Sequence, residues 1–249
     1  MQNSDYLISE NPMKALVFFS LPMIIGNLFQ QVYTMADSAI VGRLVGENAL
    51  AAVGAAYSLT NIFICIAIGG GIGASVIVSQ YFGRGSYGKL KKAVYTALIS
   101  FLLISGLLGG FGLLFSRKIM VALNTPAEVL DMSVTYLKIY FLGLPFLFMY
   151  NVLSSMFNAL GKSRIPLYFL IFSSVFNIVL DWIFVADFHL DVAGVAWATL
   201  IAQGVSVVGS FTILLKELQT MEGTADGIFA KEELLPMTKI ALPSILQQS

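Results

Sequence analysis

The stretch FNIVLDWIF, residues 176–184, places the aspartate Asp181 in the middle of an apolar run. No other charged residue occurs between Pro166 and Ala186. About 20 apolar residues are enough for a helix to cross the hydrocarbon region of a bilayer. The stretch therefore predicts a membrane helix that contains a carboxylate, and a carboxylate in that position calls for a functional explanation.

The composition of the whole chain agrees with this interpretation. Hydrophobic residues make up 57% of the 249 residues and charged residues 11%, against roughly 45–50% and about 25% in soluble domains. The mean hydropathy is +0.84. The formal net charge is zero, which gives no indication of nucleic-acid binding, and a single cysteine, Cys65, excludes a disulfide within the chain. We expect an all-α polytopic protein surrounded by membrane lipid.

Apolar segments long enough to span a membrane occur at residues 14–40, 49–82, 93–115, 129–157, 166–186 and 191–215. Turn-forming residues separate them, as at Asn124-Thr125-Pro126. Asn11 and Pro12 are suited to cap and begin the first helix. The predicted organisation is a six-helix transmembrane lobe over residues 1–215, a polar cytoplasmic linker over 216–233, and the start of a seventh helix over 234–249.

The seventh segment resembles the first. FFSLPMII, residues 18–25, and KIALPSIL, residues 239–246, share Leu-Pro-x-Ile. Six spans return the chain to the side on which it began, so a repeat starting here would run parallel to the first helix. This pattern favours the first half of a two-lobe transporter followed by the start of its second lobe. The alternative is a chance Leu-Pro pair in a six-helix protein.

Basic residues predict the orientation, because lysine and arginine are enriched in cytoplasmic connections. Alternate connections lie on opposite sides of the membrane. One side has Lys14, Arg84, Lys89, Lys91, Lys92, Lys162, Arg164, Lys216, Lys231 and Lys239, and the other has Arg43, Arg117 and Lys118. We therefore predict a cytoplasmic N-terminus.

Three of the predicted helices carry polar residues on one face. Asn177 precedes Asp181 by four residues, which places both on the same side of a helix. The first helix contributes Asn27, Gln30, Gln31, Thr34 and Asp37, and the sixth contributes Thr199, Gln203 and Ser206. Asp37 and Asp181 both fall in the outer half of the membrane, at comparable depth.

Two carboxylates at this depth are compatible with two roles. Desolvation disfavours the charged form, so one of them can hold a proton, and oxygens of Asp, Asn and Thr can instead coordinate Na⁺. A structural alternative is that Asp181 bonds to a neighbouring helix and Asp37 lies in the outer interface. Neither aspartate has the Tyr-Asp or Gly-x-Gly-Asp motif of an intramembrane aspartyl protease. We expect no catalytic residue, no metal site and no enzyme activity.

Further polar residues are candidates to line a cavity, with packing as the alternative for the tyrosine: Gln30, Gln31, Tyr33, Thr34, Asn151, Ser154 and Gln203. Pro22 removes a backbone hydrogen bond within the first helix, which makes it a candidate hinge or a static kink. GGGIGAS, residues 69–75, resembles a dinucleotide fingerprint but lacks the strand–turn–helix context. Small residues for close helix packing explain it better.

Four stretches, in order, resemble the multidrug and toxic compound extrusion (MATE) family: QQVYTMADSAIVGRLVGENALAAVG, FNALGKSRIPLY, FNIVLDWIF and GVAWATLIAQ. The resemblance implies the N-terminal six-helix lobe of a two-lobe (6+6) transporter. Members export organic cations and other drugs, driven by inward flow of H⁺ or Na⁺ and without a further cofactor. The resemblance therefore also implies a location in the bacterial plasma membrane. By position, the cation-coupling residues of the N-terminal lobe match Asp37, Asn177, Asp181 and Thr199. Because members have twelve helices, a C-terminal lobe is the expected partner.

Two alternatives remain open at this point. A flippase of lipid-linked or polysaccharide precursors would use a similar helical architecture. Such lobes tend to have a more basic cavity, whereas the membrane-embedded charges here are acidic. The other alternative is an inactive half-transporter fragment, or a half-size transporter that dimerises.

Overall fold

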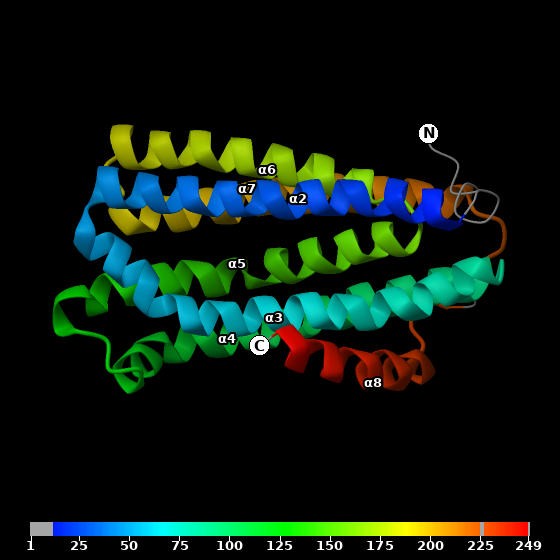
Figure 1. Cartoon of the computed structure of the whole chain (residues 1–249). Helices are drawn as coiled ribbons and strands as arrows, with labels where there is room; N and C mark the ends of the chain where they lie inside the picture. The colour runs from blue at the N-terminus through cyan, green and yellow to red at the C-terminus, as the bar shows by residue number, and fades with distance from the viewer. Residues whose placement is uncertain (1–11, 225–226, 249) are drawn as a thin grey trace.

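A computed structural model describes residues 12–224 and 227–248. Within these ranges the chain is helical (Figure 1), with the elements α2 Pro12–Ile40, η1 Val41–Val45, α3 Glu47–Gly83, α4 Tyr87–Ala122, α5 Ala127–Ala159, α6 Arg164–Trp182, η2 Ile183–Asp187, α7 Asp191–Thr220 and α8 Lys231–Gln248. The short elements η1 and η2 are π-helical turns. Six helices in the described part of the chain are long and apolar enough to cross a membrane. The predicted six-span all-α fold is confirmed.

Several helices extend beyond their apolar segments. α4 begins at Tyr87 rather than near residue 93, and α7 continues past Lys216 to Thr220. Lysines allow this extension because their apolar stems lie along the helix while the ammonium group reaches water. α8 begins at Lys231, three residues before the expected start. The predicted cap at Asn11 lies outside the described residues, and α2 is helical from Pro12.

The polar connection between α7 and α8 is bonded to α4. The Lys91 ammonium donates to the carbonyl oxygens of Met221 at 2.9 Å and Gly223 at 2.7 Å. The backbone N–H of Ala230 donates to Thr96 Oγ1 at 2.9 Å. A segment whose composition indicates only a solvated linker is therefore held against α4.

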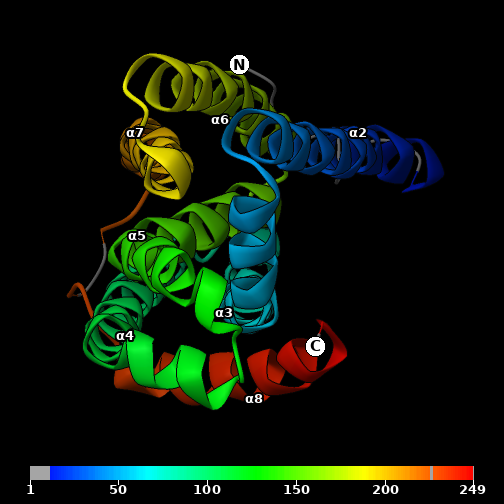
Figure 2. The same ribbon diagram turned by 90° about the vertical axis from the view of Figure 1, so that its left-hand side faces the viewer.

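α5 lies at the centre of the bundle and packs against α3, α4 and α7. Its large side chains Leu153, Met156 and Phe157 are buried in the main hydrophobic core. Figure 2 shows α2, α6 and α7 grouped on one side of α5, with α3, α4 and α8 on the other. α2 packs mainly against α6. This arrangement leaves a space bounded by α2, α3, α5, α6 and α7.

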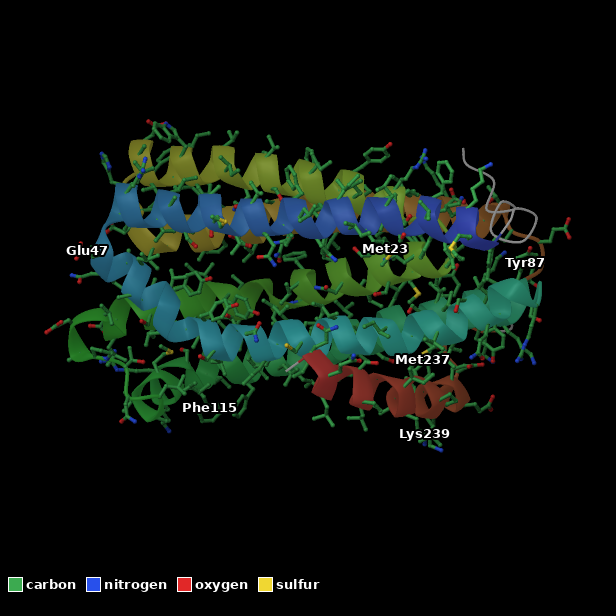
Figure 3. The ribbon with its side chains drawn as sticks, viewed as in Figure 1. Met23, Glu47, Tyr87, Phe115, Met237 and Lys239 are labelled. Atoms are coloured by element: carbon green, nitrogen blue, oxygen red, sulfur yellow. The ribbon has the colours of Figure 1, made fainter. Side chains whose placement is uncertain are left out.

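The glycine-rich stretch 69–75 explains how α8 joins the bundle. A Cβ atom at Gly73 would lie 2.5 Å from the Met237 carbonyl oxygen, and one at Gly69 would lie 2.6 Å from the Ile245 backbone nitrogen. Figure 3 shows Met237 on the side of α8 that faces α3 and Lys239 on the side that faces away. Close helix packing is therefore confirmed as the role of these glycines.

The outer surface of the bundle is suited to lipid. On α4, the exposed fractions of Leu103, Leu107 and Leu114 are 62%, 76% and 81%, and a continuous apolar face of this kind marks a surface that contacts membrane or protein. The turns between helices alternate between two ends, so Glu47 and Tyr87 lie at opposite ends in Figure 3. The predicted cytoplasmic orientation of the N-terminus stays a prediction.

Candidate functional site

Three helices bring the predicted polar residues together. Asp37 lies in the last turn of α2, Asp181 lies in the last turn of α6, and Thr199 lies in the first third of α7. α6 packs against both α2 and α7. The side chains of Asp37 and Asp181 come within hydrogen-bonding reach of each other. The two aspartates, which the sequence places at comparable depth in the membrane, therefore also lie next to each other.

Asn177 connects all three helices. With its amide oriented to satisfy its neighbours, the nitrogen donates to Asp181 Oδ2 at 3.1 Å and to Tyr33 Oη at 2.7 Å. Its oxygen accepts from Thr199 Oγ1 at 3.3 Å. Asn177 and Asp181 are 2% and 0% exposed, so these bonds replace water that neither side chain can reach.

The paired carboxyl groups have a chemical requirement. An ionised carboxylate only accepts hydrogen bonds, so a bond between two carboxyl groups needs one proton. Asp37 Oδ1 and Asp181 Oδ1 are buried and have no hydrogen-bond partner among the described residues. The site therefore offers lone pairs to a proton or to a small cation, and two uncompensated charges here would repel each other strongly.

Two tyrosines complete the site. Tyr33, predicted from the sequence as a cavity residue, forms a hydrogen bond with Asn177 and lines a small chamber beside the site rather than the large cavity. Tyr136 of α5 lies close enough to interact electrostatically with both carboxylates. The spacing of four residues between Tyr33 and Asp37 repeats that between Asn177 and Asp181, and this signal could have identified Tyr33. The sequence holds no comparable signal for Tyr136, because its position depends on how α5 is rotated.

A cavity of about 570 Å³ lies beside this site. Its lining includes six of the seven predicted cavity residues, namely Gln30, Gln31, Thr34, Asn151, Ser154 and Gln203. Tyr57, Asn61 and Asn158 also line it. None of the described residues that line the cavity is charged. The buried carboxylates thus adjoin a polar but neutral cavity.

A smaller chamber of about 50 Å³ lies next to the cavity. Tyr33, Asn177 and Thr199 line it together with Gln30 and Gln203. Gln30 and Gln203 also line the large cavity. The chamber therefore adjoins both the large cavity and three of the residues that surround the carboxylates.

A family model described as MatE matches residues 22–183, which span both carboxylates and most of the cavity. The chain belongs to the MatE family. This family comprises the multidrug and toxic compound extrusion (MATE) transporters, and the chain is similar to several of its members.

The "Probable multidrug resistance protein YpnP" of Bacillus subtilis is 32% identical over 84% of this chain and 47% of its own length. The "Multidrug export protein MepA" of Staphylococcus aureus strain MRSA252 is 27% identical over 97% of this chain and 54% of its own length. An outward-facing structure of a multidrug resistance MATE family transporter superposes on the entire chain with a TM-score of 0.91 and 26% identity, covering 55% of that transporter. This MATE chain spans about half the length of these relatives and has the fold of an N-terminal lobe.

Proposed function

We propose that the chain forms the ion-coupling lobe of a multidrug exporter that expels organic cations in exchange for H⁺ or Na⁺. The observation that supports this most directly is the pairing of the half-buried Asp37 with the fully buried Asp181 beside the cavity. Buried carboxylates in a membrane are costly and are retained where ions move. The names of the relatives from Bacillus subtilis and Staphylococcus aureus refer to multidrug resistance and export.

The coupling follows from electrostatics. With no cation bound, the pair holds negative charge in a desolvated position, and binding of H⁺ or Na⁺ neutralises part of it. A cation drives a conformational change only to the extent that it binds the two conformations with different affinity. Asp37 belongs to α2 and Asp181 to α6, so their distance changes when α2 moves relative to α6. The bound cation therefore favours the conformation in which the two helices are close.

The lining of the cavity favours flat organic cations as substrates. Aromatic faces attract cations, and Tyr57 and Tyr150 line the cavity. Amide oxygens of Asn61, Asn151 and Gln203 provide further acceptors. Because no described lining residue is charged, substrate binding in this lobe depends on aromatic and dipolar contacts, which tolerate variation in substrate shape. We propose that a C-terminal lobe closes the cavity from the other side.

The test is ion-driven export by the protein that carries this chain, reconstituted in liposomes. Ethidium transport is followed under an imposed pH gradient or an imposed Na⁺ gradient, which identifies the coupling ion. Asp37→Asn and Asp181→Asn keep the size of the side chain and remove its charge, and each is expected to abolish gradient-driven transport. Asp131→Asn, which changes an exposed carboxylate paired with Arg117, is the matched control.

The amount of folded protein is measured by size-exclusion chromatography for every variant. Wild-type rates from both Asp37→Asn and Asp181→Asn would contradict the assignment of these residues to coupling. Loss of transport in Asp131→Asn as well would indicate a general effect of removing acidic residues.

A further inference from the structure

Each helix that contributes to the carboxylate site has a valine about one turn further toward the η1–η2 end of the bundle. Val41 follows Asp37 by four residues, and Val185 follows Asp181 by four residues. α7 runs in the opposite direction, and there Val195 precedes Thr199 by four residues. Since residues four apart share a helix face, the three valines stack directly beyond the polar groups.

These valines meet one another. Val41, Val185, Val192 and Val195 belong to one buried cluster and are 1%, 6%, 2% and 3% exposed. Ala49 completes this cluster, and Tyr136 packs against it. Side chains of this kind leave no polar path, because an ion that passed between them would lose its hydration without gaining a ligand. We call the four valines the valine seal.

The backbone changes from α-helical to π-helical at the level of these valines. α2 and α6 both end in π-helical turns, with the Gly46 N–H donating to the Val41 carbonyl at 3.2 Å and the Phe188 N–H donating to the Ile183 carbonyl at 3.1 Å. π-helical turns are rare and concentrate at functional sites. A wider turn in each helix directs Val41 and Val185 toward α7, where both contact the same cluster.

The opposite side of the carboxylate site is polar. The chamber of about 50 Å³ is lined by Gln30, Ser173 and Gln203 as well as by Tyr33, Asn177 and Thr199. Polar groups surround the carboxylates toward the cavity, and apolar groups cover them toward the η1–η2 end. The free-energy cost of moving an ion is therefore much higher toward the η1–η2 end than toward the cavity.

We propose that the valine seal is the barrier that separates the coupling site from the medium at the η1–η2 end, so that the coupling ion enters and leaves through the cavity. This inference rests on the proposed function. Ion and drug then share one access route, and whichever compartment the cavity faces is the compartment with which the carboxylates exchange. While the seal blocks the η1–η2 end, the carboxylates receive ions from the side to which the cavity opens. Without the seal, ions could also reach them from the η1–η2 end.

The experiment measures ion flux without drug through the protein that carries this chain, reconstituted in liposomes with an internal pH or Na⁺ indicator. Val185→Ser and Val195→Ser place a hydroxyl in the seal. Each is expected to raise the drug-free flux about tenfold, which corresponds to about 1.4 kcal/mol off the barrier. Val185→Ile and Val195→Ile keep the seal apolar and are expected to retain the wild-type flux.

Val207→Ser is the matched control, because Val207 also lies on α7 and is 8% exposed but belongs to a different core cluster. Wild-type flux from both serine variants, in protein whose thermal stability shows that it is folded, would overturn the proposal. Equal flux from Val207→Ser would overturn it too, since loosening of the bundle would then be sufficient. A wild type that fails to export ethidium would refute the proposed function, whereas the flux comparison would still decide whether the seal exists.

Discussion

The bond between Tyr33 and Asn177 provides a quantitative test of how α2 is attached to the lobe. Tyr33 Oη lies 2.7 Å from the Asn177 amide. Tyr33→Phe removes the hydroxyl and keeps the ring, whereas Asn177→Leu replaces the amide with an apolar group that branches at the same atom. Hydrogen bonds between membrane helices contribute about 0.6 kcal/mol on average and at most about 1.7 kcal/mol. A short bond to a buried amide should lie near the middle of this range, so we expect about 1 kcal/mol.

The two variants should not be additive. Asn177→Leu also leaves Asp181 Oδ2 and Thr199 Oγ1 without the contacts that the amide makes, so we expect it to lower the free energy of unfolding by about 2–3 kcal/mol. Tyr33→Phe should cost about 1 kcal/mol alone and close to nothing in the Asn177→Leu background. Equilibrium unfolding in mixed micelles of dodecyl maltoside and sodium dodecyl sulfate gives the interaction energy as a double-mutant cycle.

Tyr81→Phe serves as the control, because its hydroxyl donates to Glu233 at 2.8 Å where α3 meets α8. That variant should be additive with Asn177→Leu to within about 0.5 kcal/mol. An interaction energy below about 0.3 kcal/mol for Tyr33 and Asn177 would refute the reasoning, because the bond would then contribute nothing to holding α2.

Two further predictions concern helix packing and the hinge. Gly73→Ala should lower the free energy of unfolding by about 1–3 kcal/mol, because the added methyl would meet α8 at 2.5 Å; Gly106→Ala, whose added methyl has nothing within 4 Å, should be neutral or stabilising in the same unfolding assay. Pro22→Ala restores a backbone donor and should stabilise α2 by up to about 3 kcal/mol, while ethidium export should fall if Pro22 is a hinge. Unchanged export would leave Pro22 as a static kink.

The sequence predicted the spans because hydrophobic length is a local property. Each apolar segment had to be helical, since a helix satisfies its own backbone hydrogen bonds in lipid. The depth of Asp37 and Asp181 was also predictable, because it follows from counting residues along a helix. Whether the two carboxylates meet depends on how α2 and α6 are rotated and packed, and no local pattern specifies that.

The predicted helix boundaries were wrong for the same reason, because local sequence does not specify contacts between distant segments. Hydropathy indicates where the hydrocarbon ends, whereas a helix ends where its backbone bonds stop being satisfied. Thus α4 continues through Lys89 and Lys91 into the polar region. The segment after Thr220 looked like a free linker because its composition is polar, but Lys91 and Thr96 supply partners for its backbone. Partners that are distant in sequence cannot be read from composition.

The attachment of α2 differs on the two sides of Pro22. On the N-terminal side, Ser163 donates a hydrogen bond to the Phe19 carbonyl at 3.0 Å, and neither group can change its charge. On the other side, the contacts involve Tyr33 with Asn177 and Asp37 with Asp181, so they include the carboxyl groups that we propose bind the coupling cation. A change in cation occupancy alters the second set of contacts and leaves the first unchanged. Pro22 lies between them, at the point in α2 where one backbone hydrogen bond is already missing, and bending there would disrupt the fewest bonds.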